Sequence, residues 1–323
     1  MRLIRPFDSI EIQSLPVLIY GPPGIGKTSL LQTADSPFTL DFDGGIHRSA
    51  NRRDAMQFDS WSEVLKVGEE GYHQDGEELV GPMFDPFKTL GIDTGGMALE
   101  KLIPEVLRDS AKNGYSGNLS PQGWGVLGSR FVNWMRTVRS WGKSVVMVCH
   151  QAEDRNASDQ AYFRPEFPGK MAYSYVHKSF DMIGRIYQEG HKKILDFSPR
   201  ENQVGKNAAG FPPVEIPDLH KNPTFLADLI VKAKLAIGKT AEASAATSKA
   251  VGQWIQFLAT MPEPNELNDE LRGLAQLPTG AKVQVWALIK SHAEKRGFIW
   301  DKDAKRFSSQ QTEEVQAEEG VPA

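Results

Sequence analysis

Hydrophobic and polar positions along this 323-residue chain form short apolar runs separated by longer amphipathic stretches. Apolar runs bounded by glycine, proline or acidic residues predict buried strands. Such runs lie at 17–20, 37–42, 87–93, 144–149, 182–187 and 193–197. Apolar residues repeating every three or four positions predict helices. Such stretches lie at 97–111, 124–141 and 224–237. Strands alternating with helices are typical of an α/β domain with a mostly parallel sheet flanked by helices.

The C-terminal part of the chain has a different pattern. Residues 250–307 carry helical periodicity and no strand-like alternation, which predicts a small all-helical module. The segment 238–249 is small and polar, and we expect a linker there between this module and a domain at 1–237. Residues 308–323 contain four glutamates and no lysine or arginine, which predicts a disordered acidic tail.

One segment combines a strand, a glycine-rich loop and a helix start. It reads Gly21, Pro22, Pro23, Gly24, Ile25, Gly26, Lys27, Thr28 and Ser29, and it follows the apolar run 17–20. This order fits the phosphate-loop motif, in which glycines let backbone N–H groups wrap around phosphates. We expect Lys27 to reach the terminal phosphates of ATP and Thr28 to ligate Mg²⁺. A second Gly-Lys-Thr at 238–240 lacks the first glycine and the leading strand, so we interpret it as part of a helix end.

Polar residues at the ends of three other predicted strands complete this candidate site. Asp93 ends the run 87–93, where a carboxylate can help to hold Mg²⁺. Asp41 lies at the end of the run 37–42 and Asp43 directly follows it, and His150 with Gln151 follows 144–149. Carboxyl ends of parallel strands meet at one edge of a sheet, so we expect these groups near the phosphate loop. His150 and Gln151 either sense the γ-phosphate or only cap their strand.

Composition limits the remaining possibilities. The net charge is −4, so any nucleic-acid surface must be local. The single cysteine excludes a disulfide framework and fits a reducing, cytoplasmic compartment. No apolar run approaches 18 residues and the first residues lack a signal-peptide core, so we expect a protein that does not enter membranes.

Two basic regions are candidates for contacts beyond the nucleotide. Residues 152–180 show little periodicity and predict a loop in which Arg155, Arg164, Lys170 and Lys178 alternate with aromatic rings. Cations beside flat rings suit single-stranded DNA, but acidic residues dilute the charge, and a loop that packs its own aromatics fits equally. Farther on, Arg200 and Lys206 either are solvated or reach the nucleotide of a neighbouring subunit as a finger.

The order of these motifs resembles the RecA-type ATPase core. Residues 14–237 are similar, more narrowly, to the phage-encoded RecA-core proteins of the single-strand-annealing group. The resemblance is carried by the phosphate loop, Asp41-Phe-Asp-Gly-Gly, Ile92-Asp-Thr, Val146-Met-Val-Cys-His-Gln, Trp124-Gly-Val-Leu-Gly-Ser-Arg-Phe, Pro168-Gly-Lys and Val204-Gly-Lys-Asn.

The resemblance implies roles for several of these residues. Asp43 falls where RecA-like proteins place the glutamate that polarises the attacking water, with Asp41 as the alternative. An aspartate is one methylene shorter, which implies a longer reach or slow hydrolysis. His150 and Gln151 match the sensor that links the γ-phosphate to the DNA-facing loop, here 152–178. Arg200 or Lys206 matches the finger between subunits, which implies a head-to-tail homo-oligomer.

We therefore expect a RecA-like P-loop ATPase that uses ATP and Mg²⁺ and acts on single-stranded DNA in phage-type recombination, annealing or repair, in the host cytoplasm. The C-terminal module resembles helical tails that recruit other recombination or replication proteins. Three alternatives stay open: an ATP-driven helicase loader or motor, a small-molecule kinase, and a nucleotide-gated binding module with little turnover. A kinase needs an arginine-rich lid, and 152–178 is a poor candidate for one.

Overall fold

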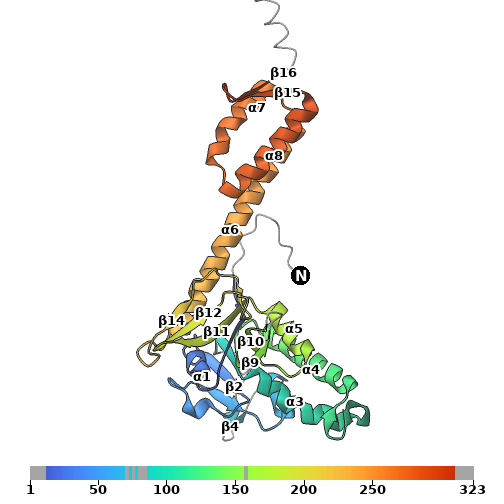
Figure 1. Cartoon of the computed structure of the whole chain (residues 1–323), viewed down its shortest axis with the longest axis vertical. Helices are drawn as coiled ribbons and strands as arrows, with labels where there is room; N and C mark the ends of the chain where they lie inside the picture. Colours follow the sequence, from blue (N-terminus) through green and yellow to red (C-terminus); the bar gives the residue numbers. More distant parts are fainter. Residues whose placement is uncertain (1–11, 70–72, 75–76, 79–85, 156–158, 310–323) are drawn as a thin grey trace, which may run out of the picture. The chain divides into compact units, whose positions relative to one another are not determined.

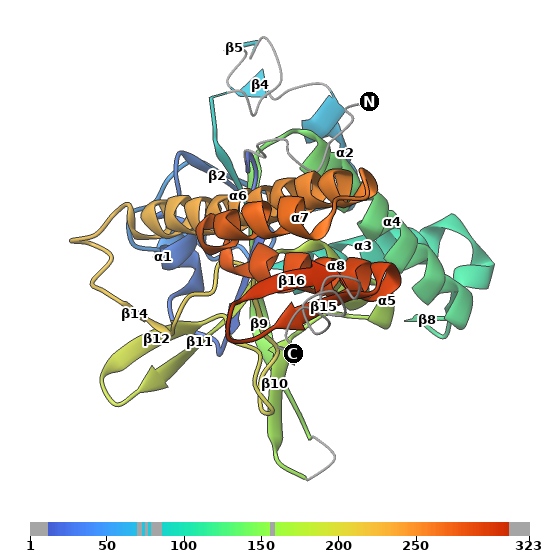
Figure 2. The same ribbon diagram turned by 90° about the horizontal axis from the view of Figure 1, so that it is seen from above.

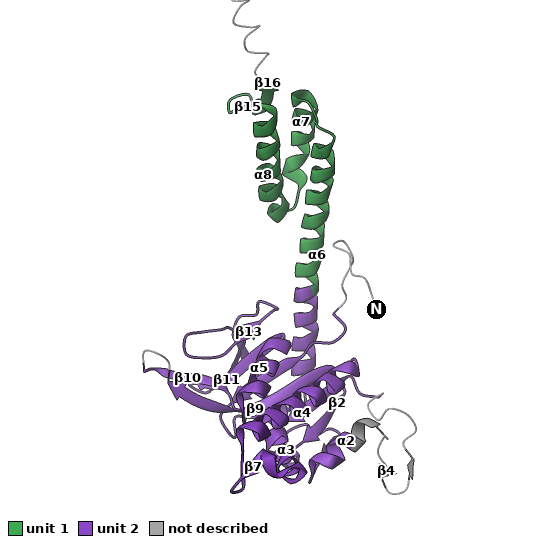
Figure 3. Ribbon diagram, turned by 90° about the vertical axis from the view of Figure 1, so that its right-hand side faces the viewer, with its two compact units in different colours: residues 1–11, 238–323 green, residues 12–237 purple. Residues whose placement is uncertain are grey.

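The computed structural model describes residues 12–69, 73–74, 77–78, 86–155 and 159–309 (Figure 1). These residues form two compact units, one of residues 12–237 and one that begins at Gly238 (Figure 3). The phosphate-loop motif and the other predicted site residues all belong to the first unit.

A ten-stranded sheet forms the centre of the first unit, and its inner strands run parallel. In spatial order the main strands are β14 (Val214–Ile216), β12 (Lys192–Asp196), β11 (Met182–Glu189), β1 (Val17–Gly21), β9 (Ser144–Arg155), β6 (Thr89–Asp93), β2 (Pro37–Asp41) and β3 (Ala55–Gln57). Two more strands pair off this path, β10 (Ala161–Pro165) with β9 and β13 (Lys206–Asn207) with β11. The prediction of an α/β domain with a mostly parallel sheet is confirmed.

Helices cover both faces of this sheet. One face packs against α2 (Trp61–Glu69), α3 (Gly95–Asp109), α4 (Pro121–Ser140) and α5 (Lys170–Ser179). The other face packs against α1 (Lys27–Leu31) and the first turns of α6 (Phe225–Ala259). The shorter elements are the 3₁₀ turns η1 (Ile46–Arg48) and η2 (Ala111–Asn113) and the two-residue strands β4 (His73–Gln74), β5 (Glu77–Glu78), β7 (Gly114–Tyr115) and β8 (Asn118–Leu119).

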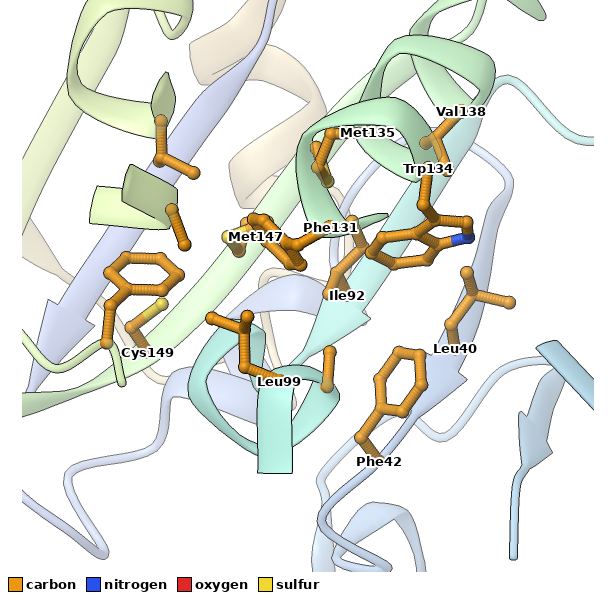
Figure 4. Close-up of a cluster of buried hydrophobic side chains, with 14 of the residues drawn as sticks. Leu40, Phe42, Ile92, Leu99, Phe131, Trp134, Met135, Val138, Met147 and Cys149 are labelled. Atoms are coloured by element: carbon orange, nitrogen blue, oxygen red, sulfur yellow. The ribbon is translucent and has the colours of Figure 1, made fainter. Parts of the chain in front are cut away.

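The core on the α3–α4 side holds the strands that carry the candidate site. Phe131 and Met135 of α4 are fully buried against Ile92 of β6 and Met147 of β9 (Figure 4). Each side chain of this size contributes about 1.5–3 kcal/mol of hydrophobic stabilisation when buried. This packing fixes the end of β6, which bears Asp93, and the middle of β9, which bears His150.

The described residues of 152–180 do not form the irregular loop that the sequence predicted. Strand β9 continues to Arg155, and β10 returns antiparallel to it, with Phe163 opposite Glu153. Figure 2 shows this hairpin extending beyond the rest of the sheet. The Tyr20 hydroxyl anchors the base of this hairpin by donating hydrogen bonds to the backbone oxygens of Val204 (2.7 Å) and Phe163 (3.1 Å). Hydrogen bonds between β9 and β10 pair the backbone groups of both strands. The local hydrophobic pattern does not predict this pairing.

The second unit contains helices as expected, together with a hairpin that the sequence analysis did not anticipate. Its elements are the later turns of α6, α7 (Pro264–Leu271), η3 (Arg272–Gln276), α8 (Thr279–Arg296), β15 (Phe298–Asp301) and β16 (Arg306–Ser309). Trp254, Leu267, Val285 and Phe307 are buried in its core. Among the described residues of both units, no helix is long and apolar enough to span a membrane.

The segment 238–249, predicted as a linker, is helical and forms the middle of α6. Its alanines are strong helix formers, and this propensity outweighs the small size and polarity that suggested a linker. The predicted acidic tail lies outside the described residues except for 308–309, which belong to β16.

Candidate nucleotide-binding site

The glycine-rich loop connects the end of β1 to the start of α1. Gly24 and Gly26 have positive φ angles of 73° and 105°. Residues with a side chain rarely adopt such angles, so these two glycines let the loop turn tightly. Ile25, between them, instead packs against the hydrophobic core. The loop therefore exposes backbone on the cavity side and an apolar side chain on the core side.

Lys27 begins α1 and folds back over the loop. Its Nζ donates to the backbone oxygens of Gly21 at 3.0 Å and Pro22 at 2.9 Å. Only 6% of the residue is exposed. Burial lowers the pKa of the Lys27 ammonium, while the nearby Asp93 carboxylate opposes that shift. A buried ammonium with one free donor direction is well placed for a phosphate oxygen.

Thr28 and Asp93 meet beside the loop. The Thr28 hydroxyl donates to Asp93 Oδ2 at 2.6 Å. Asp93 is almost completely buried, and burial raises the pKa of its carboxyl to about 6 although the Thr28 hydrogen bond opposes the rise. A hydroxyl and a carboxylate in contact are an oxygen pair suited to Mg²⁺, which keeps several water ligands of its own.

A cavity of about 480 Å³ opens over this pair. It is lined by Pro23, Gly24, Gly26, Lys27, Thr28, Ser29, Asp43, Gly45, Arg48, Ser49, Asp93, Thr94 and His150. The structure therefore brings most of the predicted site residues together. The residues predicted for the nucleotide site that are outside this lining are Gly21, Pro22, Ile25, Asp41, Gln151, Arg200 and Lys206.

Asp41, the last residue of β2, and Asp43, just beyond it, have different environments. Asp41 is 1% exposed and accepts hydrogen bonds from the backbone N–H groups of Gly44, Gly45 and Ile46 and from the Gln57 side chain. Asp43 is exposed and lines the cavity. Asp41 thus holds the turn after β2, and Asp43 is the carboxylate available to a water molecule.

Arg48 and Ser49 line the cavity but were absent from the sequence analysis, and Gly45 appeared there only within the Asp41-Phe-Asp-Gly-Gly motif. A Cβ added at Gly45 would lie 3.0 Å from Arg48 Nη2 and 3.3 Å from Asp43 Oδ2, so a cation and a carboxylate flank this glycine. The backbone N–H of Ala50 donates to Ser29 Oγ at 3.0 Å and ties the segment to α1. No periodic pattern marks Arg48, because an irregular turn held by Asp41 sets its position.

His150 and Gln151 were predicted as a pair, but they lie in different surroundings. His150 lines the cavity, and its Nδ1 is buried without a hydrogen-bond partner among the described residues. Gln151 instead accepts from Arg185 Nε at 2.8 Å, and the Arg185 guanidinium lies 3.6 Å from the ring centre of Phe163 in β10. Adjacent residues of a strand point to opposite faces, so only His150 faces the cavity.

The predicted finger residues have partners elsewhere in the unit. Arg200 is half exposed and pairs with the buried Asp196 at 2.8 Å. Lys206 donates to the backbone oxygen of Lys178 at 3.2 Å, so its ammonium lies at the end of α5.

The predicted DNA-contacting residues differ in how far their charges are already paired. Arg164 forms an ion pair with Asp154 at 2.5 Å, and Arg155 lies 4.0 Å from Asp159. Lys170 and Lys178 are exposed on α5, and no carboxylate of the described residues forms an ion pair with either. The free charge of this region is therefore on the helix and not on the hairpin.

Divalent-metal binding at this site would depend on the nucleotide and on water. Across the described ranges, no group of three or more His, Cys, Asp and Glu side chains gathers as a metal site. Thr28 and Asp93 provide two oxygens, and phosphate oxygens and water are the usual remaining ligands of Mg²⁺. The residues present fit a nucleotide-bound Mg²⁺ and not a cage made of protein alone.

Residues 13–209, about three-fifths of the chain, match the family model described as an AAA domain. The chain belongs to this AAA-domain family. The AAA domain is a P-loop nucleotide-binding ATPase module, and the match covers the loop, Asp43, Asp93 and His150. AAA domains typically bind ATP with Mg²⁺, in agreement with the chemistry of this cavity. No curated protein shows significant similarity to the chain.

Proposed function

We propose that this protein hydrolyses ATP with Mg²⁺ and couples the reaction to single-stranded DNA. Support for ATP hydrolysis comes from the contact between Thr28 and Asp93 at the glycine-rich loop, with Asp43 in the same cavity. The loop amides and Lys27 hold the β- and γ-phosphates, and Thr28 and Asp93 hold the metal.

In this proposal Asp43 orients the attacking water. The water oxygen forms a bond to the γ-phosphorus, the bond to the β,γ-bridging oxygen breaks, and the water proton passes toward the Asp43 carboxylate or to a phosphate oxygen. Arg48 and Lys27 neutralise the charge that gathers on the phosphate oxygens. His150 faces the same cavity and is our candidate for sensing the γ-phosphate.

Support for DNA binding comes from α5. Lys170 and Lys178 lie eight residues apart, or about 12 Å along a helix, and the Lys206 ammonium lies beside Lys178. Tyr173 and His177 stack on the same helix at 5.9 Å. Unpaired ammonium groups next to stacked rings suit a strand whose phosphates and bases are both accessible.

The resemblance to RecA-core proteins favours recombination or annealing as the process, in a head-to-tail oligomer. Arg200 keeps an exposed guanidinium while paired to Asp196, so we retain it as the candidate finger between subunits. We assign Lys206 to the DNA surface instead, because of its contact with α5. The C-terminal module is our candidate for recruiting replication or recombination proteins.

The decisive experiment measures ATP hydrolysis by the full chain with Mg²⁺, with and without single-stranded DNA. Stimulation by single-stranded DNA supports the proposal. Equal stimulation by duplex DNA together with strand separation would identify a motor or loader instead. Turnover that depends on a small phosphate acceptor and not on DNA would identify a kinase.

A nucleotide-gated module with little turnover is the second candidate. It is favoured by Asp43, because this carboxylate is short, exposed and receives no hydrogen bond from the described residues to hold it in place. Tight binding of ATP without hydrolysis, with DNA affinity that changes when ATP is added, would support this candidate and exclude the ATPase.

A further inference from the structure

Two adjacent lysines at the start of β12 have opposite surroundings. Lys192 Nζ forms an ion pair with Glu215 of β14 at 2.6 Å. Lys193 is exposed, and in the described parts of the chain no carboxylate forms an ion pair with it. Neighbouring residues of a strand point to opposite faces of the sheet, so the two ammonium groups lie on different sides.

The Lys193 ammonium lies beside the phosphate loop. A Cβ added at Gly26 would be 3.5 Å from Lys193 Nζ, which places that Nζ within about 5 Å of the Gly26 Cα, given a bond of about 1.5 Å. Any side chain at position 26 would occupy the space between the loop and this ammonium. Glycine at this position thus serves the turn and also keeps the loop backbone open toward Lys193.

Packing on the same face of β12 fixes this placement. Leu195, two residues after Lys193, is fully buried in the cluster that contains Leu30 and Leu31 of α1. Because strand side chains repeat every two residues, Lys193 must lie on this α1 face as well. The core therefore fixes the face of the sheet on which the Lys193 side chain lies.

The order of strands puts Lys193 and Asp93 on opposite sides of the loop. Strand β1, which leads into the loop, lies between β9 and β11. Beyond β9 comes β6 with Asp93, and beyond β11 comes β12 with Lys193. A nucleotide whose metal-bound phosphates face Asp93 would therefore have Lys193 on the other side of the loop.

We propose that Lys193 is a further nucleotide-binding residue, whose ammonium contacts the phosphate chain on the side away from the metal. This inference rests on the proposed ATP site and adds a cation from a strand that carries no motif. An unpaired lysine is a compact charge suited to a phosphate oxygen. Because this contact is away from the γ-phosphate, ATP and ADP should both depend on it.

Calorimetric titration of the full chain with MgATP and MgADP tests the proposal. Lys193→Ala should weaken both nucleotides by a similar factor, on the order of tenfold for one lost charged hydrogen bond. Lys193→Arg should retain most of the affinity. Lys192→Ala removes the same charge one residue away on the other face of the sheet. Its affinities for MgATP and MgADP should stay within about twofold of wild type.

The outcomes separate this inference from the proposed function. Wild-type affinity in Lys193→Ala, or an equal loss in Lys192→Ala, would overturn the role of Lys193 while leaving the ATP site intact. Failure of the wild-type protein to bind either nucleotide would overturn the ATP site, and the inference with it. Thermal unfolding without nucleotide should be the same for both alanine variants, which excludes a folding defect.

Discussion

The Thr28 hydroxyl and the Asp93 carboxylate are in hydrogen-bond contact at 2.6 Å, although 65 residues separate them in the sequence. Strand β9 lies between the strands that lead to them, so only the sheet brings them together. Asp93 is buried and lies near the carboxylates of Asp41 and Asp43, which also raise its pKa. Keeping this buried carboxylate ionised therefore lowers the stability of the folded state. A bound divalent cation would offset that loss, and several predictions depend on it.

Asp93→Asn should stabilise the protein when metal and nucleotide are absent. The pKa of Asp93 is raised from 3.8 to about 6, so its ionised form destabilises the folded state at neutral pH. The loss of folding free energy caused by ionised Asp93 grows between about pH 4 and pH 6 and is constant above that range. We expect Asp93→Asn to gain about 2–3 kcal/mol at pH 7.5 in EDTA and almost nothing at pH 4.

Urea unfolding at the two pH values measures this difference. The asparagine side chain of this variant would keep an oxygen that accepts from Thr28, so the hydrogen bond itself is not lost. The same variant should lose most of the thermal stabilisation that MgATP gives to the wild type, because one metal ligand becomes neutral. A variant that is less stable than wild type in EDTA at pH 7.5 would contradict this account of Asp93.

Lys27→Ala should abolish measurable binding of ATP while the protein stays folded. Lys27 supplies the buried ammonium at the loop, and its partners in the structure are two loop carbonyls that water can satisfy in the variant. Lys239→Ala, in the second Gly-Lys-Thr, is the matched control, because Lys239 lies within helix α6. Calorimetry should show wild-type affinity for this control, and unchanged affinity in Lys27→Ala would refute the site.

Asp43→Ala and Asp41→Ala should affect different properties. Asp43 is exposed in the cavity, so we expect wild-type unfolding temperature and ATP affinity but a hydrolysis rate at least about tenfold lower. Asp41→Ala leaves buried N–H groups without an acceptor and should cost about 2–4 kcal/mol of stability. Normal turnover in Asp43→Ala would mean that another group orients the water.

Lys170→Ala combined with Lys178→Ala should weaken single-stranded DNA binding and its dependence on salt. Removing two phosphate contacts should reduce the slope of log affinity against log salt by about 1.4. The double variant Lys112→Ala with Lys232→Ala removes the same charge from exposed positions on other elements and serves as the control. Fluorescence anisotropy over a range of salt concentrations provides the slopes, and equal slopes in the two double variants would place the DNA surface elsewhere.

Local sequence was sufficient to predict the phosphate loop and the strand–helix order around it. The glycines at positions 24 and 26 allow positive φ angles whatever their surroundings, and the apolar run before them specifies a buried strand. Asp93 was also predictable, because a carboxylate that ends an apolar strand must lie at the sheet edge. These features depend on neighbours in sequence.

Only the tertiary structure decided which of two adjacent candidates faces the cavity. Asp41 and Asp43 are the same residue type two positions apart, but backbone N–H groups of the following turn surround the first. His150 and Gln151 are separated by strand alternation, and the direction of that alternation depends on the packing of β9 between β1 and β6. Arg48 and Lys193 reach the loop from segments without any motif.

The sequence by itself therefore determined that a phosphate-loop motif is present and which class of fold presents it. The tertiary structure decided which charges surround that loop, which arginines are already paired, and that 151–155 pair antiparallel with 161–165. The physical reason is that backbone conformation is set over a few neighbouring residues, whereas burial and charge pairing depend on segments that meet only after the sheet has assembled.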